Sequence, residues 1–154
     1  MSIRLRYYYV SIMSVNGQHA SLSAARQINN YPHGHHFYRL GVTDTDFPAH
    51  HPEFADDVLL DIEKIERGEI KYAQWDGQGF EHRITATQVE FEHAIFNECP
   101  EWPIWRCTLA QYKAALLGWR TFIDMPVSID SELIVELPDS PAGFEHFKKS
   151  ESSA

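Results

Sequence analysis

The stretch from Cys107 to Pro126, CTLAQYKAALLGWRTFIDMP, constrains the fold more than any other part of the chain. Its large apolar residues recur at intervals of three and four, which places them on one face of a helix: Leu109, Tyr112, Leu116, Trp119 and Ile123. Thr108 and Gln111 have the spacing of a capping box, in which each side chain pairs with the backbone N–H of the other residue. Pro126 lacks an N–H and ends the helix. The sequence therefore predicts an amphipathic helix that covers an apolar core.

Segments before and after this helix have the alternation and the turn residues of antiparallel strands. The first segment is rich in Tyr, Val and Ile, ends at Asn16-Gly17 and is expected near the middle of a sheet. Asp76-Gly77 lies between two strand-like runs and predicts a hairpin. Strands are expected at Ile3–Val15, Ile70–Trp75, Phe80–Ala86, Gln88–Phe96 and Val127–Leu137, the last with weaker alternation.

A second amphipathic helix is expected from Asp56 or Asp57 to Glu69. Its apolar positions share one face (Val58, Leu59, Ile62 and Ile65), its acids gather at the start as the helix dipole favours, and Gly68 lies near its end. The remaining segments are less regular: residues 18–30 are compatible with a short helix or a loop, residues 37–42 with a strand, and residues 43–55 and 97–107 with loops.

Taken together, these elements predict an α+β fold, with a mainly antiparallel sheet of about five strands and two main helices packed on it. Residues 1–137 form a single globular domain in this prediction, and residues 138–154 form a poorly ordered C-terminal tail.

Charge and cysteine content limit the classes of function. The formal net charge of −9 disfavours direct binding of nucleic acid, because an acidic surface repels phosphate. Arg4 and Arg6 precede three consecutive tyrosines, which are poor signal-peptide residues, and no apolar run approaches the roughly 18 residues of a membrane span. Cys99 and Cys107 are too few for a disulfide framework. We therefore expect a reduced, cytoplasmic protein without a membrane partner.

The acids are unevenly distributed along the chain. Residues 1–40 hold four arginines and no acid, whereas residues 41–69 hold nine acids and two bases. This acidic stretch predicts either a solvated surface or a docking surface for a basic partner. The residues assigned to partner binding are Asp44, Asp46, Glu53, Asp56 and Asp57, and the acidic segment 130–145 is the second candidate.

Histidines and cysteines supply the alternative of a metal site or an enzyme. Five imidazoles lie close together in the sequence, at His33, His35, His36, His50 and His51. Imidazole is a common metal ligand, but no HExxH or CxxC spacing accompanies these residues, so no metal or cofactor is assigned and solvated histidines remain the simpler interpretation. A buried pair of unreactive thiols is the simpler interpretation of Cys99 and Cys107. Cys107 precedes the predicted N-cap, where a helix N-terminus lowers the pKa of a thiol, and is the only candidate for a nucleophile.

The region 57–124 resembles the small immunity proteins of bacterial polymorphic-toxin systems, including contact-dependent growth inhibition. The resemblance rests on a helix at Val58–Glu69, the hairpin at Trp75-Asp76-Gly77, a strand through Val89 and Phe91, and the closing helix. It implies an inhibitor that binds a basic toxin domain, often a nuclease, in the cytosol, and it supplies no catalytic residue. The leading hypothesis is therefore a non-enzymatic immunity protein. A metal-binding protein or enzyme, and a structural or adaptor domain, stay open as alternatives.

Overall fold

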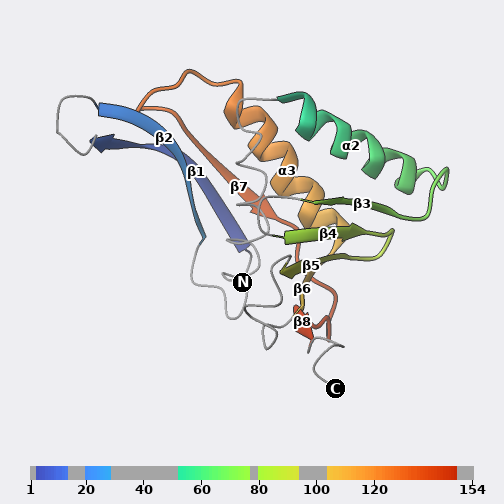
Figure 1. Ribbon diagram of the computed structural model, residues 1–154. Helices are drawn as coiled ribbons and strands as arrows, with labels where there is room; N and C mark the ends of the chain where they lie inside the picture. Colours follow the sequence, from blue (N-terminus) through green and yellow to red (C-terminus); the bar gives the residue numbers. More distant parts are fainter. Residues whose placement is uncertain (1–2, 14–19, 29–51, 77–79, 94–103, 149–154) are drawn as a thin grey trace.

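The computed structural model describes residues 3–13, 20–28, 52–76, 80–93 and 104–148. Within these residues the strands form two antiparallel sheets, and two helices pack against them (Figure 1). The predicted α+β class, with antiparallel strands and two main helices, is confirmed. The strands are divided between a three-stranded and a five-stranded sheet instead of gathering in one sheet.

The three-stranded sheet has the order β2-β1-β7. Strand β1 (Ile3–Met13) lies in the middle, as expected, and pairs antiparallel with β2 (Ala20–Ile28) and with β7 (Glu132–Leu137). The expectation of a short helix or loop over residues 18–30 is wrong, because β2 pairs with β1 from Met13↔Ala20 to Leu5↔Ile28. Local composition was a poor guide here, since strand formation depends strongly on the neighbouring strand.

The five-stranded sheet has the order β3-β4-β5-β6-β8. Strands β3 (Ala73–Asp76) and β4 (Phe80–Ile84) are the two arms of the predicted hairpin, and β5 (Val89–His93) follows them as expected. Strand β6 (Ile104–Cys107) lies in a segment expected to be a loop, and it pairs with both β5 and the short β8 (Phe147–Lys148).

Ordered structure continues past residue 137, where the sequence analysis places the start of a poorly ordered tail. Gln111 Nε2 donates hydrogen bonds to Pro138 O at 2.9 Å and to Ser140 Oγ at 2.8 Å. Residues 147–148 then add β8 to the edge of the five-stranded sheet. Because these contacts join residues far apart in sequence, no local pattern in residues 138–148 indicates them.

Helix α3 (Leu109–Ile123) begins with the predicted capping box. Thr108 Oγ1 accepts a hydrogen bond from Gln111 N at 3.1 Å, and Thr108 N donates to Gln111 Oε1 at 3.0 Å. The helix lies between the two sheets and not only above one of them. On one side Tyr7 Oη donates to Ala115 O at 2.9 Å, and on the other side Tyr112 packs against His82 of β4.

Helix α2 (Pro52–Glu66) begins four or five residues before the predicted start at Asp56 or Asp57. Proline is tolerated in the first turn of a helix because its missing N–H has no partner there in any case. The helix buries Ala55, Val58, Ile62 and Ile65 in the common core. Just after its last turn, Gly68 adopts a φ of 77°, a left-handed conformation that glycine reaches without steric cost.

Candidate functional site

Three of the five predicted partner-binding acids lie in the described residues, all in the first turns of α2. Asp56 Oδ1 accepts a hydrogen bond from Arg120 Nε of α3 at 2.8 Å, and Glu53 and Asp57 are exposed. On the helical wheel Asp57 lies 100° from Asp56, on the side away from α3. Asp44 and Asp46 lie outside the described residues. The structure therefore brings Asp56, but not Asp57, to the side shared by the two helices, and Glu53 lies between these two residues on the helical wheel.

The two helices run antiparallel and are joined on their solvent side by two ion pairs. One is Asp56–Arg120, and the other joins Lys113 Nζ to Glu66 Oε1 at 2.8 Å. Between these two pairs, at the same level of the helix pair, lie Leu60 of α2 and Leu117 of α3, each 45% exposed. We call this surface the helix-pair face. It comprises Glu53, Asp56, Leu60, Glu63 and Glu66 of α2, with Lys113, Leu117 and Arg120 of α3 and its C-cap Asp124.

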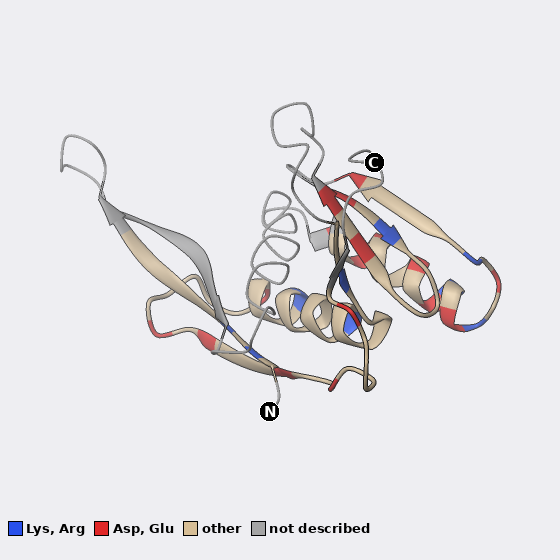
Figure 2. Ribbon diagram, turned by 90° about the horizontal axis from the view of Figure 1, so that it is seen from below, with Lys and Arg blue, Asp and Glu red and all other residues tan. Residues whose placement is uncertain are grey.

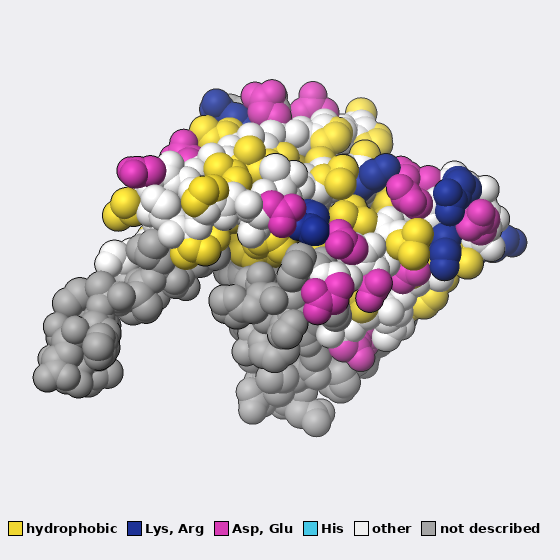
Figure 3. All heavy atoms as spheres, turned by 90° about the horizontal axis from the view of Figure 1, so that it is seen from above, with side chains coloured by type: hydrophobic (Ala, Val, Ile, Leu, Met, Phe, Trp, Pro, Cys, Tyr) yellow, Lys and Arg dark blue, Asp and Glu magenta, His cyan; other side chains and the backbone are white. Residues whose placement is uncertain are grey.

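The electrostatic character of the helix-pair face is acidic. Its two bases are each bound to a carboxylate, and hydrogen bonds to Asp56 and Asp124 raise the pKa of Arg120 above its ordinary value. Five acids against two bases leave this surface with a net charge of −3. Figure 3 views the molecule from the side of the helices and shows hydrophobic side chains separated and bordered by acidic ones. An apolar centre with a charged rim is typical of a protein-binding surface.

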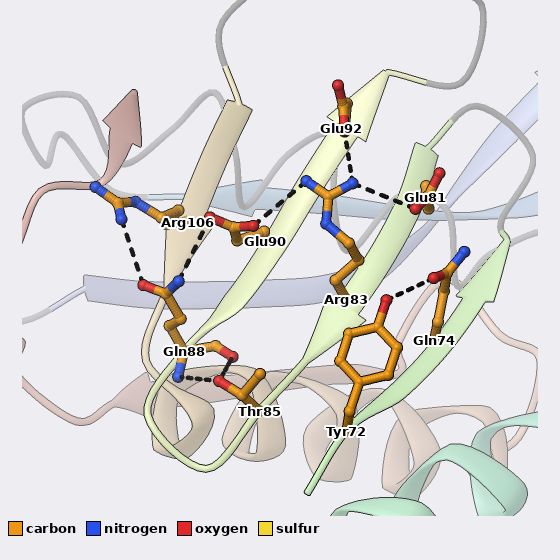
Figure 4. Close-up of polar contacts among 9 residues, drawn as sticks. All are labelled: Tyr72, Gln74, Glu81, Arg83, Thr85, Gln88, Glu90, Glu92 and Arg106. Atoms are coloured by element: carbon orange, nitrogen blue, oxygen red, sulfur yellow. Dashed lines mark hydrogen bonds and ion pairs between the residues drawn. The ribbon is translucent and has the colours of Figure 1, made fainter. Parts of the chain in front are cut away.

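The solvent side of the five-stranded sheet carries a second concentration of charge (Figure 4). Arg83 of β4 donates to Glu92 Oε2 at 2.6 Å, to Glu81 Oε1 at 3.2 Å and to Glu90 Oε1 at 3.3 Å. Burial lowers the pKa of Arg83, but its bonds to Glu92 and Glu81 outweigh this effect and leave that pKa above the ordinary value. We call this surface the charged sheet face, formed by Glu81, Arg83, Gln88, Glu90, Glu92 and Arg106.

The charged sheet face has a structural role that its pairing explains. Glu81 lies directly opposite Glu92 in the β4–β5 register, and like charges in such a position are destabilising. Arg83 bonds to both and so offsets the repulsion. Gln88 and Arg106 extend the network to β6. These charges stabilise one another within the sheet, so the face carries little free charge for a partner.

The histidines assigned to a metal site, His33, His35, His36, His50 and His51, lie outside the described residues. In the part of the chain that the structure describes, no group of three His, Cys, Asp or Glu residues is arranged to hold a metal ion. His82, which was not assigned to a metal site, lies in the core. It is fully buried, its ring stacks on Trp75 at 3.8 Å between centroids, and its Nδ1 lies 3.2 Å from Tyr112 Oη.

For Cys107 the interpretation as a buried, unreactive thiol is supported, and the alternative of a pKa lowered by the helix N-terminus is wrong. Its side chain is fully buried among the core residues, and burial raises the pKa of the thiol well above its ordinary value. Cys107 ends β6 opposite Val89, which is also fully buried, so its side chain lies on the core side of the sheet. A raised pKa keeps the thiol protonated and unreactive at neutral pH. Cys99 lies outside the described residues.

A polar cluster that no local sequence pattern predicted joins the C-terminal segment to α3 and β6. Ser140 Oγ lies 2.9 Å from His146 Nε2, and His146 Nδ1 lies 3.2 Å from Arg106 O. This pattern assigns the imidazole proton to Nδ1 and makes Nε2 the acceptor from Ser140. Buried Gln111 also donates to Ser140 Oγ, so the hydroxyl is held as one link of a chain of bonds. We call these residues the C-terminal clip: Arg106, Gln111, Pro138, Ser140 and His146.

The second acidic candidate, segment 130–145, does not form one surface. Glu132 pairs with Arg6 of β1, with Arg6 Nε and Glu132 Oε2 2.7 Å apart, whereas Glu145 pairs with Arg106 beside the C-terminal clip.

No protein-family model, curated protein or solved structure matches the chain. Among the described residues, no helix is long and apolar enough to span a membrane.

Proposed function

We propose that this chain is a non-enzymatic immunity protein, which binds a basic toxin domain in the cytosol and thereby neutralises it. The observation that carries the proposal is the helix-pair face, where two exposed leucines lie between ion pairs and are bordered by further carboxylates. A toxin that acts on nucleic acid needs a basic surface, and an acidic inhibitor complements that surface.

The leucines and the acids of this face have different roles in the proposal. Leu60 and Leu117 provide the apolar centre, whose burial slows dissociation of the complex. Glu53 and Glu63 are exposed on the solvent side of α2 and provide the long-range attraction that speeds association with the toxin domain. Asp56 and Glu66 each form an exposed ion pair with a base of α3 and add to the acidic border of the face.

The test requires a basic toxin domain encoded beside this gene, carrying a substitution that removes its activity. Glu63→Lys is expected to lower the association rate constant about tenfold at low salt, and to make that rate less sensitive to salt. Leu60→Ser combined with Leu117→Ser is expected to raise the dissociation rate constant about tenfold. Stopped-flow or surface-based binding kinetics at two salt concentrations measure both rates.

The matched control is Asp139→Lys, which makes the same change of charge at an exposed position outside the helix-pair face. This control should bind at nearly the unmodified rate. Equal slowing by Glu63→Lys and Asp139→Lys would show that only net charge matters and would remove the helix-pair face from the proposal. Failure of the unmodified chain to bind this toxin domain, and to protect cells that express the active toxin, would overturn the proposed function itself.

A further inference from the structure

The three-stranded sheet has a solvent face whose residues are set by strand alternation. Ile3, Leu5, Tyr7 and Tyr9 of β1 are buried towards α3, so the alternate residues point to the opposite face. In β7, Leu133 and Val135 pack against the core and Leu137 is buried, which places the residues between them on the same solvent face. We call this surface the β1–β7 face, formed by Arg4, Arg6, Tyr8, Val10, Glu132, Ile134 and Glu136.

Apolar and aromatic groups occupy the middle of the β1–β7 face. Ile134 is 57% exposed although it lies in a regular strand, and Arg6 opposite it stacks over the Tyr8 ring at 4.1 Å from the centroid. Both described helices lie on the other side of this sheet (Figures 1 and 2). Ile134 and the Tyr8 ring therefore give this sheet face an apolar centre that a partner would bury.

The charges of the β1–β7 face are arranged in two columns of opposite sign. Strand β1 contributes Arg4 and Arg6, and the neighbouring strand β7 contributes Glu132 and Glu136 (Figure 2). Two bases and two acids make the described part of this face neutral on a chain whose net charge is −9. The antiparallel register places Arg4 level with Glu136, Arg6 level with Ile134 and Tyr8 level with Glu132.

We propose that the β1–β7 face binds the same face of a second copy of this chain. The two-fold axis lies in the interface, parallel to the strands and midway between β1 and β7. Rotation about such an axis keeps the level along the strands and exchanges the columns, so β1 of each copy faces β7 of the other, while Arg6 keeps its ion pair with Glu132 of its own chain. Arg4 then faces Glu136 of the second copy, and Ile134 faces the Arg6–Tyr8 pair of the second copy.

Self-complementary charge is the reason for choosing a second copy as the occupant. A strongly basic partner would meet Arg4 and Arg6, and a strongly acidic partner would meet Glu132 and Glu136. A two-fold interface instead pairs unlike charges twice, as the isologous contact of a homodimer requires. Face-to-face packing of open sheets is also an established way to bury an apolar sheet surface.

The decisive experiment mixes two variants, Arg4→Glu and Glu136→Arg. Each variant alone should associate at least about tenfold more weakly than the unmodified chain, because its homodimer places like charges opposite each other twice. An equimolar mixture should recover the affinity to within about threefold, because both contacts of the heterodimer then join Glu to Arg. Analytical ultracentrifugation over about a hundredfold range of concentration measures these constants.

Mixing separates the interface from effects on folding. Any change of stability within each chain stays the same in the mixture, so recovery on mixing reports only the contact between copies. Ile134→Arg should also weaken the dimer about tenfold or more, whereas the control Ile129→Arg, at an equally apolar and 66% exposed position outside this face, should leave it unchanged. A monomeric unmodified chain at every concentration, or no recovery on mixing, overturns the proposal. Neither result bears on toxin binding by the helix-pair face.

Discussion

The charged sheet face and the helix-pair face both carry several acids, but the surroundings of those acids differ. On the charged sheet face a single guanidinium, from Arg83, binds three carboxylates, and the side chain of Arg83 is only 22% exposed. On the helix-pair face the acids in ion pairs are about half exposed, and two exposed leucines lie between these ion pairs. The two surfaces therefore differ in how their acids are held, and not only in the number of acids.

On this comparison, acids that are largely buried and share one guanidinium stabilise the fold, whereas acids in exposed ion pairs stay accessible to a partner. Burial strengthens the Arg83 contacts and makes their loss costly, because the carboxylates cannot return fully to water. Exposed ion pairs such as Lys113–Glu66 contribute little to folding and stay available to a partner. We therefore expect the charged sheet face to respond to substitution mainly in stability, and the helix-pair face mainly in association.

The largest expected effect is that of Arg83→Met on the charged sheet face. The substitution keeps most of the apolar stem but leaves Glu81, Glu90 and Glu92 close together without their cation. The free energy of unfolding should fall by about 2 to 3 kcal/mol, measured by urea denaturation. The control Arg67→Met removes a pair with Glu69 in which both side chains are more than half exposed, and it should change stability by less than about 0.5 kcal/mol. Equal effects of the two variants would contradict the contrast between the surfaces.

The C-terminal clip should give an intermediate effect. Gln111→Leu leaves Thr108 N and Pro138 O without their bonds to the glutamine side chain. The free energy of unfolding should fall by about 1 to 2 kcal/mol, and amide hydrogen exchange should increase first in residues 138–148. Gln74→Leu, at an exposed glutamine of β3, is the matched control and should leave both measurements nearly unchanged. Unaltered exchange in residues 138–148 of Gln111→Leu would show that the clip does not hold this segment.

Local signals in the sequence predicted α3, α2 and the β3–β4 hairpin, because caps, apolar spacing and turn residues act within a few positions. Strands β2, β6 and β8 were missed because each depends on pairing with a strand elsewhere in the chain. The same limit applied to Gln111, whose capping role was predicted while its bonds to Pro138 and Ser140 were not.

The candidate surface was predicted in part. Acids at the start of α2 indicated Glu53 and Asp56, but the pairing of Asp56 with Arg120 depends on the packing of two helices and has no local signal. Leu60 and Leu117 do have a local signal in the sequence. Each leucine falls outside the apolar stripe of its own helix and must therefore face solvent or a partner. The position of such a residue on the helical wheel was the sequence observation that could have located the helix-pair face.

The smallest expected effect comes from the Asp56–Arg120 pair, and it tests the contrast most directly. A double-mutant cycle with Asp56→Ala and Arg120→Ala should give a coupling energy below about 1 kcal/mol, because the Asp56 side chain is 54% exposed and water screens the pair. The same cycle with Glu92→Ala and Arg83→Ala should give a larger value, since that contact is 2.6 Å long and both side chains are less than one-third exposed. Denaturation of the six single and double variants measures both coupling energies under one condition. If the Asp56–Arg120 coupling equals or exceeds the Glu92–Arg83 coupling, the helix-pair face is held together by its charges as firmly as the sheet is, and its acids are no longer available for a partner.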